Sequence, residues 1–153
     1  MVIPRFVSLA LAGRPLPVHG DGTQSRCFLH VRDVVEAVMK LAQHPGAVGQ
    51  VFNLGSQEEV TIAELARRVI RIAGSRSRVQ FVPYDEAYEE GYEDMPRRIP
   101  DISKIRALID FRPTLVLDQI IRSVLDDMRR RPPAQAPPPR ASSPRRHATS
   151  KAR

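Results

Sequence analysis

Residues 17–33 read PVHGDGTQSRCFLHVRD and carry the most specific chemistry in the chain. We expect a short strand over residues 17–19, a tight Gly-Asp-Gly turn at residues 20–22 and a helix that begins at Asp33. A Gly-Asp-Gly turn is also typical of an ordinary hairpin. Asp33 is expected to cap its helix or to interact with the helix dipole, rather than to act as a catalytic base.

Three side chains of this stretch, His19, Arg26 and Phe28, are predicted to gather around the turn. A planar ring can stack on a base and a forked guanidinium can pair with phosphate oxygens, which are the contacts that a nucleoside diphosphate requires. Two other interpretations stay open: Arg26 could form a surface ion pair with Asp33, and His19 could be a structural histidine satisfied within the fold.

Helices and short strands are predicted to alternate along the chain, which indicates the α/β class. Thr61 and Glu64 have the spacing of a capping box, and the helix behind them is expected to continue to Gly74. The remaining helices are predicted over residues 4–11, 33–43, 102–109 and 115–128, and the remaining strands over residues 50–54 and 79–83. The helix over residues 33–43 has its apolar face at Val34, Val35, Val38 and Leu41, and Asp101 is expected to cap the helix over residues 102–109.

The net charge of +7 is concentrated at one end of the chain. Residues 1–128 carry 16 Lys/Arg and 17 Asp/Glu, whereas residues 129–153 carry 8 Lys/Arg and no acidic residue. The latter segment has six prolines and no Ile, Leu, Val or aromatic residue, so it is predicted to be a disordered tail that cannot bury enough apolar surface to fold. Without aromatic residues for base stacking, the tail is a poor candidate for binding nucleic acid.

The single cysteine, Cys27, excludes an internal disulfide framework and is expected to be a half-buried structural thiol. We therefore expect a cytoplasmic protein. No run of about 18 apolar residues predicts a membrane span, and the first residues lack the pattern of a signal peptide.

Four motifs follow one another in the chain: GDGTQ-x-R-x-F-x-H-V-x-D, VFNLG, TI-x-ELA and PDISK. Together they resemble the C-terminal half of the extended short-chain dehydrogenase/reductase superfamily, the NAD-dependent nucleotide-sugar epimerases and dehydratases. The resemblance is greatest to UDP-glucuronate decarboxylase, and next to UDP-glucose 4-epimerase. It covers residues 1–128 and implies the C-terminal part of a Rossmann-type α/β fold, without the N-terminal half that binds NAD.

The resemblance also implies a site for a UDP-sugar such as UDP-glucuronate or a UDP-hexose. In it, Pro17 and His19 would flank the uracil, with His19 where the family usually has Tyr or Phe. Arg26 would bind the diphosphate, whereas Phe28 and Val2 would lie against the nucleotide. The whole set of implied binding residues is Val2, Pro17, His19, Arg26, Phe28, Asp94, which matches a ribose contact, and Arg98, which matches a UDP contact.

The sequence departs from the family at several positions that matter for activity. Gly91 stands where the epimerases have an arginine, so a second phosphate contact would come from Arg97 or Arg98, or be absent. The chain has no G-x-x-G-x-x-G turn for NAD and no Tyr-x-x-x-Lys pair for hydride chemistry, nor does a Ser-His-Asp set or a metal-ligand cluster replace them. We therefore expect no catalytic, cofactor or metal site in this chain, and the oligomeric state stays open.

The favoured hypothesis is a UDP-sugar-binding portion of an NAD-dependent epimerase or decarboxylase that is inactive alone. The alternatives are a non-enzymatic interaction module whose basic tail contacts nucleic acid, and a non-functional remnant.

Overall fold

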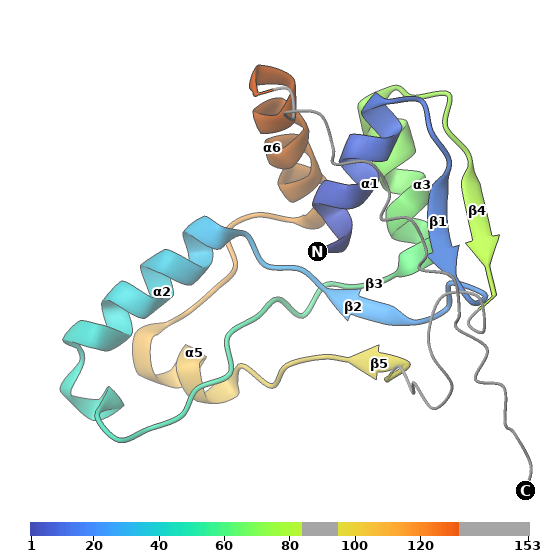
Figure 1. Ribbon diagram of the computed structural model, residues 1–153. Helices are drawn as coiled ribbons and strands as arrows, with labels where there is room; N and C mark the ends of the chain where they lie inside the picture. Colours follow the sequence, from blue (N-terminus) through green and yellow to red (C-terminus); the bar gives the residue numbers. More distant parts are fainter. Residues whose placement is uncertain (84–94, 132–153) are drawn as a thin grey trace, which may run out of the picture.

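The structure is a computed structural model that describes residues 1–83 and 95–131 (Figure 1). Helices and short strands alternate, which confirms the α/β class. In chain order the elements are α1 (Val2–Leu11), β1 (Leu16–His19), β2 (Ser25–Cys27), α2 (Val31–Gln43), the 3-10 turn η1 (Pro45–Ala47), β3 (Glu59–Thr61), α3 (Ile62–Ala73), β4 (Val79–Val82), β5 (Arg97–Arg98), α5 (Ser103–Ile109) and α6 (Leu117–Arg130).

The strands form two small sheets that share no strand. β1 pairs with β4 in parallel, from Leu16 opposite Val79 to His19 opposite Val82. β2 lies at the centre of the second sheet, antiparallel to β3 and parallel to β5. The Gly-Asp-Gly turn at residues 20–22 therefore joins two different sheets, and its interpretation as an ordinary hairpin turn is wrong.

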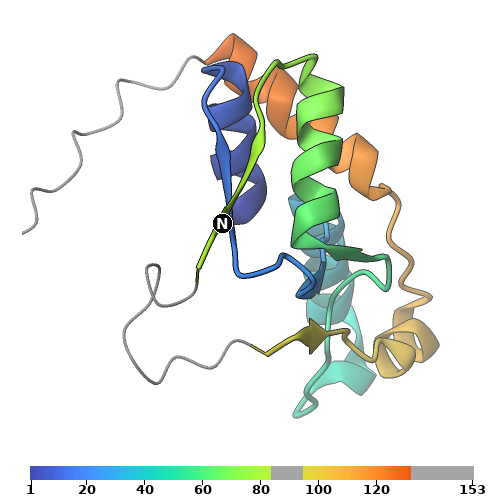
Figure 2. The same cartoon turned by 90° about the vertical axis from the view of Figure 1, so that its right-hand side faces the viewer.

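The main core lies where α1, α3 and α6 contact one another beside β1 (Figures 1 and 2). These helices bury one apolar face each, because their apolar residues recur at helical spacing. The largest fully buried side chains of this core are Phe6, Val7, Leu16, Val18, Leu65, Val69 and Ile121.

Helix α3 begins and ends where its sequence predicts. The Thr61 hydroxyl accepts the Glu64 N–H at 3.2 Å, and the helix ends at Gly74 in the left-handed conformation. Only half of the capping box forms, since the Glu64 carboxylate accepts from Arg68 Nε at 3.2 Å instead.

A smaller core lies between α2 and α5 (Figures 1 and 2). Phe52 and Leu54 pack against it from the segment 50–54, which was expected to form a strand. That expectation is wrong: the segment pairs with no strand in the described part of the chain, and Val51 is 82% exposed. The apolar residues of this segment pack against the smaller core rather than joining a sheet.

The helix α2 begins two residues earlier than predicted, and His30 rather than Asp33 caps it. His30 Nδ1 accepts the Arg32 N–H at 3.1 Å. Asp33 is buried in the first turn, where its carboxylate accepts from the Thr114 N–H at 3.2 Å and from the Thr114 hydroxyl at 2.5 Å. These bonds replace both the cap and the ion pair with Arg26 that were considered for Asp33.

The predicted apolar face of α2 is only partly buried. Val35 and Val38 are 56% and 51% exposed, whereas Asp33 and Ala37 form the buried side. The N-cap of α5 is Ile102 rather than the predicted Asp101, but Asp101 Oδ1 still accepts the N–H of Ser103, the first residue of α5, at 2.9 Å. This bond lowers the pKa of the Asp101 carboxyl.

No helix in the described ranges is long and apolar enough to cross a membrane. α6 extends to Arg130, two residues past its predicted end at residue 128, and residues 132–153 lie outside the described part of the chain.

Candidate functional site

A cavity of about 290 Å³ opens between the first turns of α1, the end of β1, β2 and the start of α3. The residues that line it come from segments far apart in the sequence: Met1, Val2, Arg5, Phe6, Pro17, His19, Gln24, Arg26 and Ile62. Four of the seven predicted binding residues, Val2, Pro17, His19 and Arg26, are therefore brought together around one cavity.

The turn after β1 is held rigidly by its own side chains. The Asp21 carboxylate accepts the Thr23 N–H at 2.9 Å and the Thr23 hydroxyl at 2.7 Å, and these bonds lower the pKa of Asp21. Gln24 Nε2 donates to the His19 carbonyl at 3.0 Å, across the base of the turn. The chain therefore reverses within a few residues and brings β2 close to the end of β1.

Helix α3 holds the same turn from the other side. The Ile62 N–H donates to the Gln24 carbonyl at 3.0 Å, and the Ala63 N–H donates to the Gly22 carbonyl at 3.1 Å. The first amides of a helix have no partner within it, so the turn supplies the acceptors that they need. The turn and α3 are thus fixed to each other, and each contributes a residue, Gln24 and Ile62, to the cavity lining.

Arg26 lies on β2 and is half-buried. Its Nη1 donates to the Ser25 carbonyl at 2.7 Å and to the Met95 carbonyl at 2.9 Å. Two bonds from one nitrogen fix the plane of the guanidinium beside the cavity. Such an oriented fork is suited to pairing with an oxyanion.

The other predicted residues lie at different distances from the cavity. Phe28 is half-buried but packs against the main core and is not part of the described cavity lining. Arg98 is exposed on β5, opposite Arg26 in the strand register, and is likewise not in that lining. Asp94 and Gly91 fall outside the described residues.

Sequence reasoning missed five lining residues: Met1, Arg5, Phe6, Gln24 and Ile62. For Arg5 there was a signal, because it is the single charge in the otherwise apolar helix Val2–Leu11. Gln24 is 8% exposed, and nothing in its local sequence shows that it would turn inward.

The lining as described contains two arginines and no carboxylate. An anion in this cavity would therefore meet favourable charge on two sides.

Cys27, next to Arg26, is half-buried as predicted. Burial raises the pKa of its thiol, and the nearby Glu59 carboxylate raises it further. Both effects disfavour the thiolate, in agreement with a structural role.

An ion pair ties the three-stranded sheet together next to the cavity. Glu59 on β3 accepts from Arg97 Nε at 3.0 Å and from Arg97 Nη2 at 3.1 Å on β5, and also from the Ser25 hydroxyl on β2. The hydrogen bonds from Arg97, and then that from Ser25, lower the pKa of Glu59 below its ordinary value of 4.5.

This lowered pKa predicts a specific pH dependence. A carboxyl whose folded-state pKa is depressed contributes stability above its unfolded pKa and loses it as the pH falls through the folded value. Glu59→Gln is therefore expected to flatten the fall in stability below about pH 4.5. Urea unfolding at a series of pH values measures this fall in stability, and Glu36→Gln, at an exposed position of α2, is the control. Equal pH slopes in the wild type and Glu59→Gln would contradict the prediction.

The described residues do not fit the pyrophosphate of NAD. A dinucleotide cradle needs a glycine-rich turn that leads from a strand into a helix N-terminus. The Gly-Asp-Gly turn after β1 leads into the strand β2 instead, and the Gly22 carbonyl is bonded to α3.

The chain matches the family model described as GDP-mannose 4,6 dehydratase over residues 1–124. It is 37% identical over 124 residues to UDP-N-acetyl-alpha-D-glucosaminuronate decarboxylase from Bacillus cytotoxicus, a match that covers 81% of this chain and 38% of that protein. It is 36% identical over 132 residues to UDP-glucuronic acid decarboxylase 4 from Arabidopsis thaliana, a match that covers 85% of this chain and 28% of that protein.

Among solved structures, dTDP-glucose 4,6-dehydratase from Bacillus anthracis in complex with NAD matches with a TM-score of 0.73 at 26% identity, over 86% of this chain and 40% of that one. The chain thus spans less than half the length of these relatives. The family model covers most of the chain, and the chain belongs to the GDP-mannose 4,6-dehydratase family of NAD-dependent nucleotide-sugar epimerases, dehydratases and decarboxylases.

Proposed function

We propose that this chain binds a UDP-sugar, of the UDP-glucuronate type, in the cavity between α1, β1 and β2. The observation that carries the proposal is the convergence of Val2, Pro17, His19 and Arg26 on one cavity from three separate elements. The relatives at 36% and 37% identity are named for decarboxylating UDP-linked uronic sugars.

Each wall of the cavity has a distinct role in this proposal. Pro17 and His19, at the end of β1, provide a flat surface for the uracil ring. Arg26 on β2 is held in a fixed plane by the Ser25 and Met95 carbonyls and pairs with the diphosphate. Val2, in the first turn of α1, covers the nucleotide from the side.

We further propose that the chain alone does not convert the sugar, because it contains no Tyr-x-x-x-Lys pair. The chain would then act as the substrate-holding part of a catalytic unit. Incubation of the chain with UDP-glucuronate and NAD, followed by chromatography of the nucleotide sugars, tests this point. Formation of a new nucleotide sugar would contradict it.

Isothermal titration with UDP-glucuronate tests the binding site. A hydrogen bond to a charged group contributes about 1.5–3 kcal/mol, so Arg26→Ala is expected to weaken binding by roughly 10- to 150-fold. Arg14→Ala removes an exposed arginine that is not in the described cavity lining, and it is expected to keep wild-type affinity. Equal affinities in the wild type and Arg26→Ala would show that the nucleotide sugar does not bind here.

A further inference from the structure

We propose that Arg5 on α1 supplies the second cation for the diphosphate, on the wall of the cavity opposite β2. This inference rests on the proposed function and names a residue that neither the binding motif nor the resemblance assigns.

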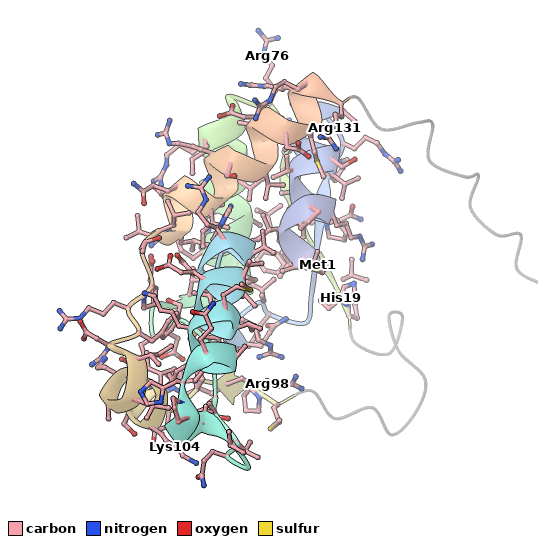
Figure 3. All side chains as sticks on the ribbon, turned by 90° about the vertical axis from the view of Figure 1, so that its left-hand side faces the viewer. Met1, His19, Arg76, Arg98, Lys104 and Arg131 are labelled. Atoms are coloured by element: carbon pink, nitrogen blue, oxygen red, sulfur yellow. The ribbon has the colours of Figure 1, made fainter. Side chains whose placement is uncertain are left out.

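Arg5 lies on the side of α1 that lines the cavity. Met1, Val2, Arg5 and Phe6 all contribute to that lining, which is the spacing of one helical face. The helix Val2–Leu11 carries no other charge, and its remaining residues are apolar apart from Ser8 and Pro4. The one charge of α1 is therefore directed to the cavity region. Figure 3 shows Met1, at the start of α1, close to His19, at the end of β1, and both line the cavity.

The Arg5 side chain is exposed, and it makes no hydrogen bond or ion pair with any residue of the ranges 1–83 and 95–131. The arginines that the sequence suggested for a second phosphate contact are placed differently. Arg97 is held by two bonds to Glu59, at 3.0 and 3.1 Å, and Arg98 is not in the described lining. Arg5 is thus the arginine that joins Arg26 at the cavity.

A diphosphate carries charge on two phosphorus centres, and one guanidinium fork pairs with the oxygens of one of them. Arg26 comes from β2 and Arg5 from α1, so the two cations approach from different walls of a cavity of about 290 Å³. The first amides of α1 add a favourable dipole on the same side as Arg5. This arrangement predicts that the site distinguishes a diphosphate from a monophosphate.

The test compares UDP and UMP by isothermal titration on the wild type, Arg5→Gln and Arg5→Lys. We expect the wild type to prefer UDP, and Arg5→Gln to weaken UDP by roughly tenfold while UMP changes by less than about twofold. Arg5→Lys keeps the charge without the fork and is expected to recover part of the UDP preference. Because Arg5 is exposed, Arg5→Gln is expected to keep the wild-type circular dichroism spectrum and melting temperature.

The outcomes separate the two proposals. If the wild type prefers UDP and Arg5→Gln keeps that preference in full, the assignment of Arg5 is overturned, whereas the proposed function stands. If the wild type binds neither UDP nor UMP, the proposed function fails, and the role of Arg5 fails with it. Arg14→Ala, an exposed arginine away from the described lining, is expected to bind both nucleotides as the wild type does.

Discussion

Gly22→Ala is expected to lower the free energy of unfolding by roughly 2–5 kcal/mol. No other substitution proposed for this chain is expected to cost more. Gly22 has a φ of +74°, which L-residues adopt at a cost of about 1–2 kcal/mol. An added Cβ would also lie 2.7 Å from Val18 Cγ1 and 2.8 Å from the Ala63 Cβ. Both neighbours are buried, so relieving the overlap requires a shift of the backbone, and overpacking of this kind typically costs about 1–3 kcal/mol.

The backbone at this position is not free to move away. The Gly22 carbonyl accepts the Ala63 N–H at 3.1 Å, and this bond holds the turn on the first residues of α3. A shift at Gly22 would therefore disturb either α3 or the end of β1, where His19 lines the cavity. Weaker binding of UDP-glucuronate is expected together with the lower stability.

Gly13→Ala is the matched control. Gly13 has a φ of +64°, but nothing lies within 4 Å of the place where its Cβ would be. Gly13→Ala is therefore expected to cost only the about 1–2 kcal/mol of the left-handed conformation, because its added Cβ overlaps with no neighbouring atom. Urea unfolding of both variants separates the two contributions, and an equal loss of stability would show that the contact with Val18 and Ala63 is relieved without cost.

The helices and strands that the sequence predicts correctly are those whose defining residues lie within the element itself. α3 has its cap at Thr61 and its left-handed glycine at Gly74, within one continuous amphipathic segment. β4 is a short apolar run that pairs with β1. In each case the residues that define the element also define its ends.

The strands that the sequence did not predict form only because they pair with residues far away in the chain. β2 is three residues long, with the sequence Ser-Arg-Cys, and it is a strand because β3 and β5 pair with it from positions more than 30 and 70 residues further on. Such a segment has no periodicity of its own. The error at residues 50–54 has the opposite origin: the segment has strand-like composition but packs against the smaller core.

The residues of the candidate site differ in the same way, since some are predicted by a local motif and others depend on packing between distant segments. His19 and Arg26 flank one turn, so the motif predicted them together, and the cavity contains both. Gln24 reaches the cavity because the turn is packed on α3, which no local pattern records. For Arg5 the sequence offers only its position as the single charge of α1.

Asp33→Ala is expected to lower the free energy of unfolding by about 2–4 kcal/mol, because it removes two hydrogen bonds to a buried carboxylate. Asp33 is 2% exposed and accepts both the N–H and the hydroxyl of Thr114, 81 residues away. These bonds connect the first turn of α2 to the segment between α5 and α6. Glu36→Ala, on the same helix, removes an exposed ion pair with Lys40 and is expected to cost about 0.5 kcal/mol or less.

A double-mutant cycle with Thr114→Val assigns the loss to this contact. Thr114→Val removes the hydroxyl and leaves the N–H, so the double variant is expected to lose less stability than the sum of the single variants. Additive losses would show that Asp33 acts through some other interaction. A loss for Asp33→Ala no larger than that for Glu36→Ala would show that the bonds between Asp33 and Thr114 do not stabilise the fold measurably.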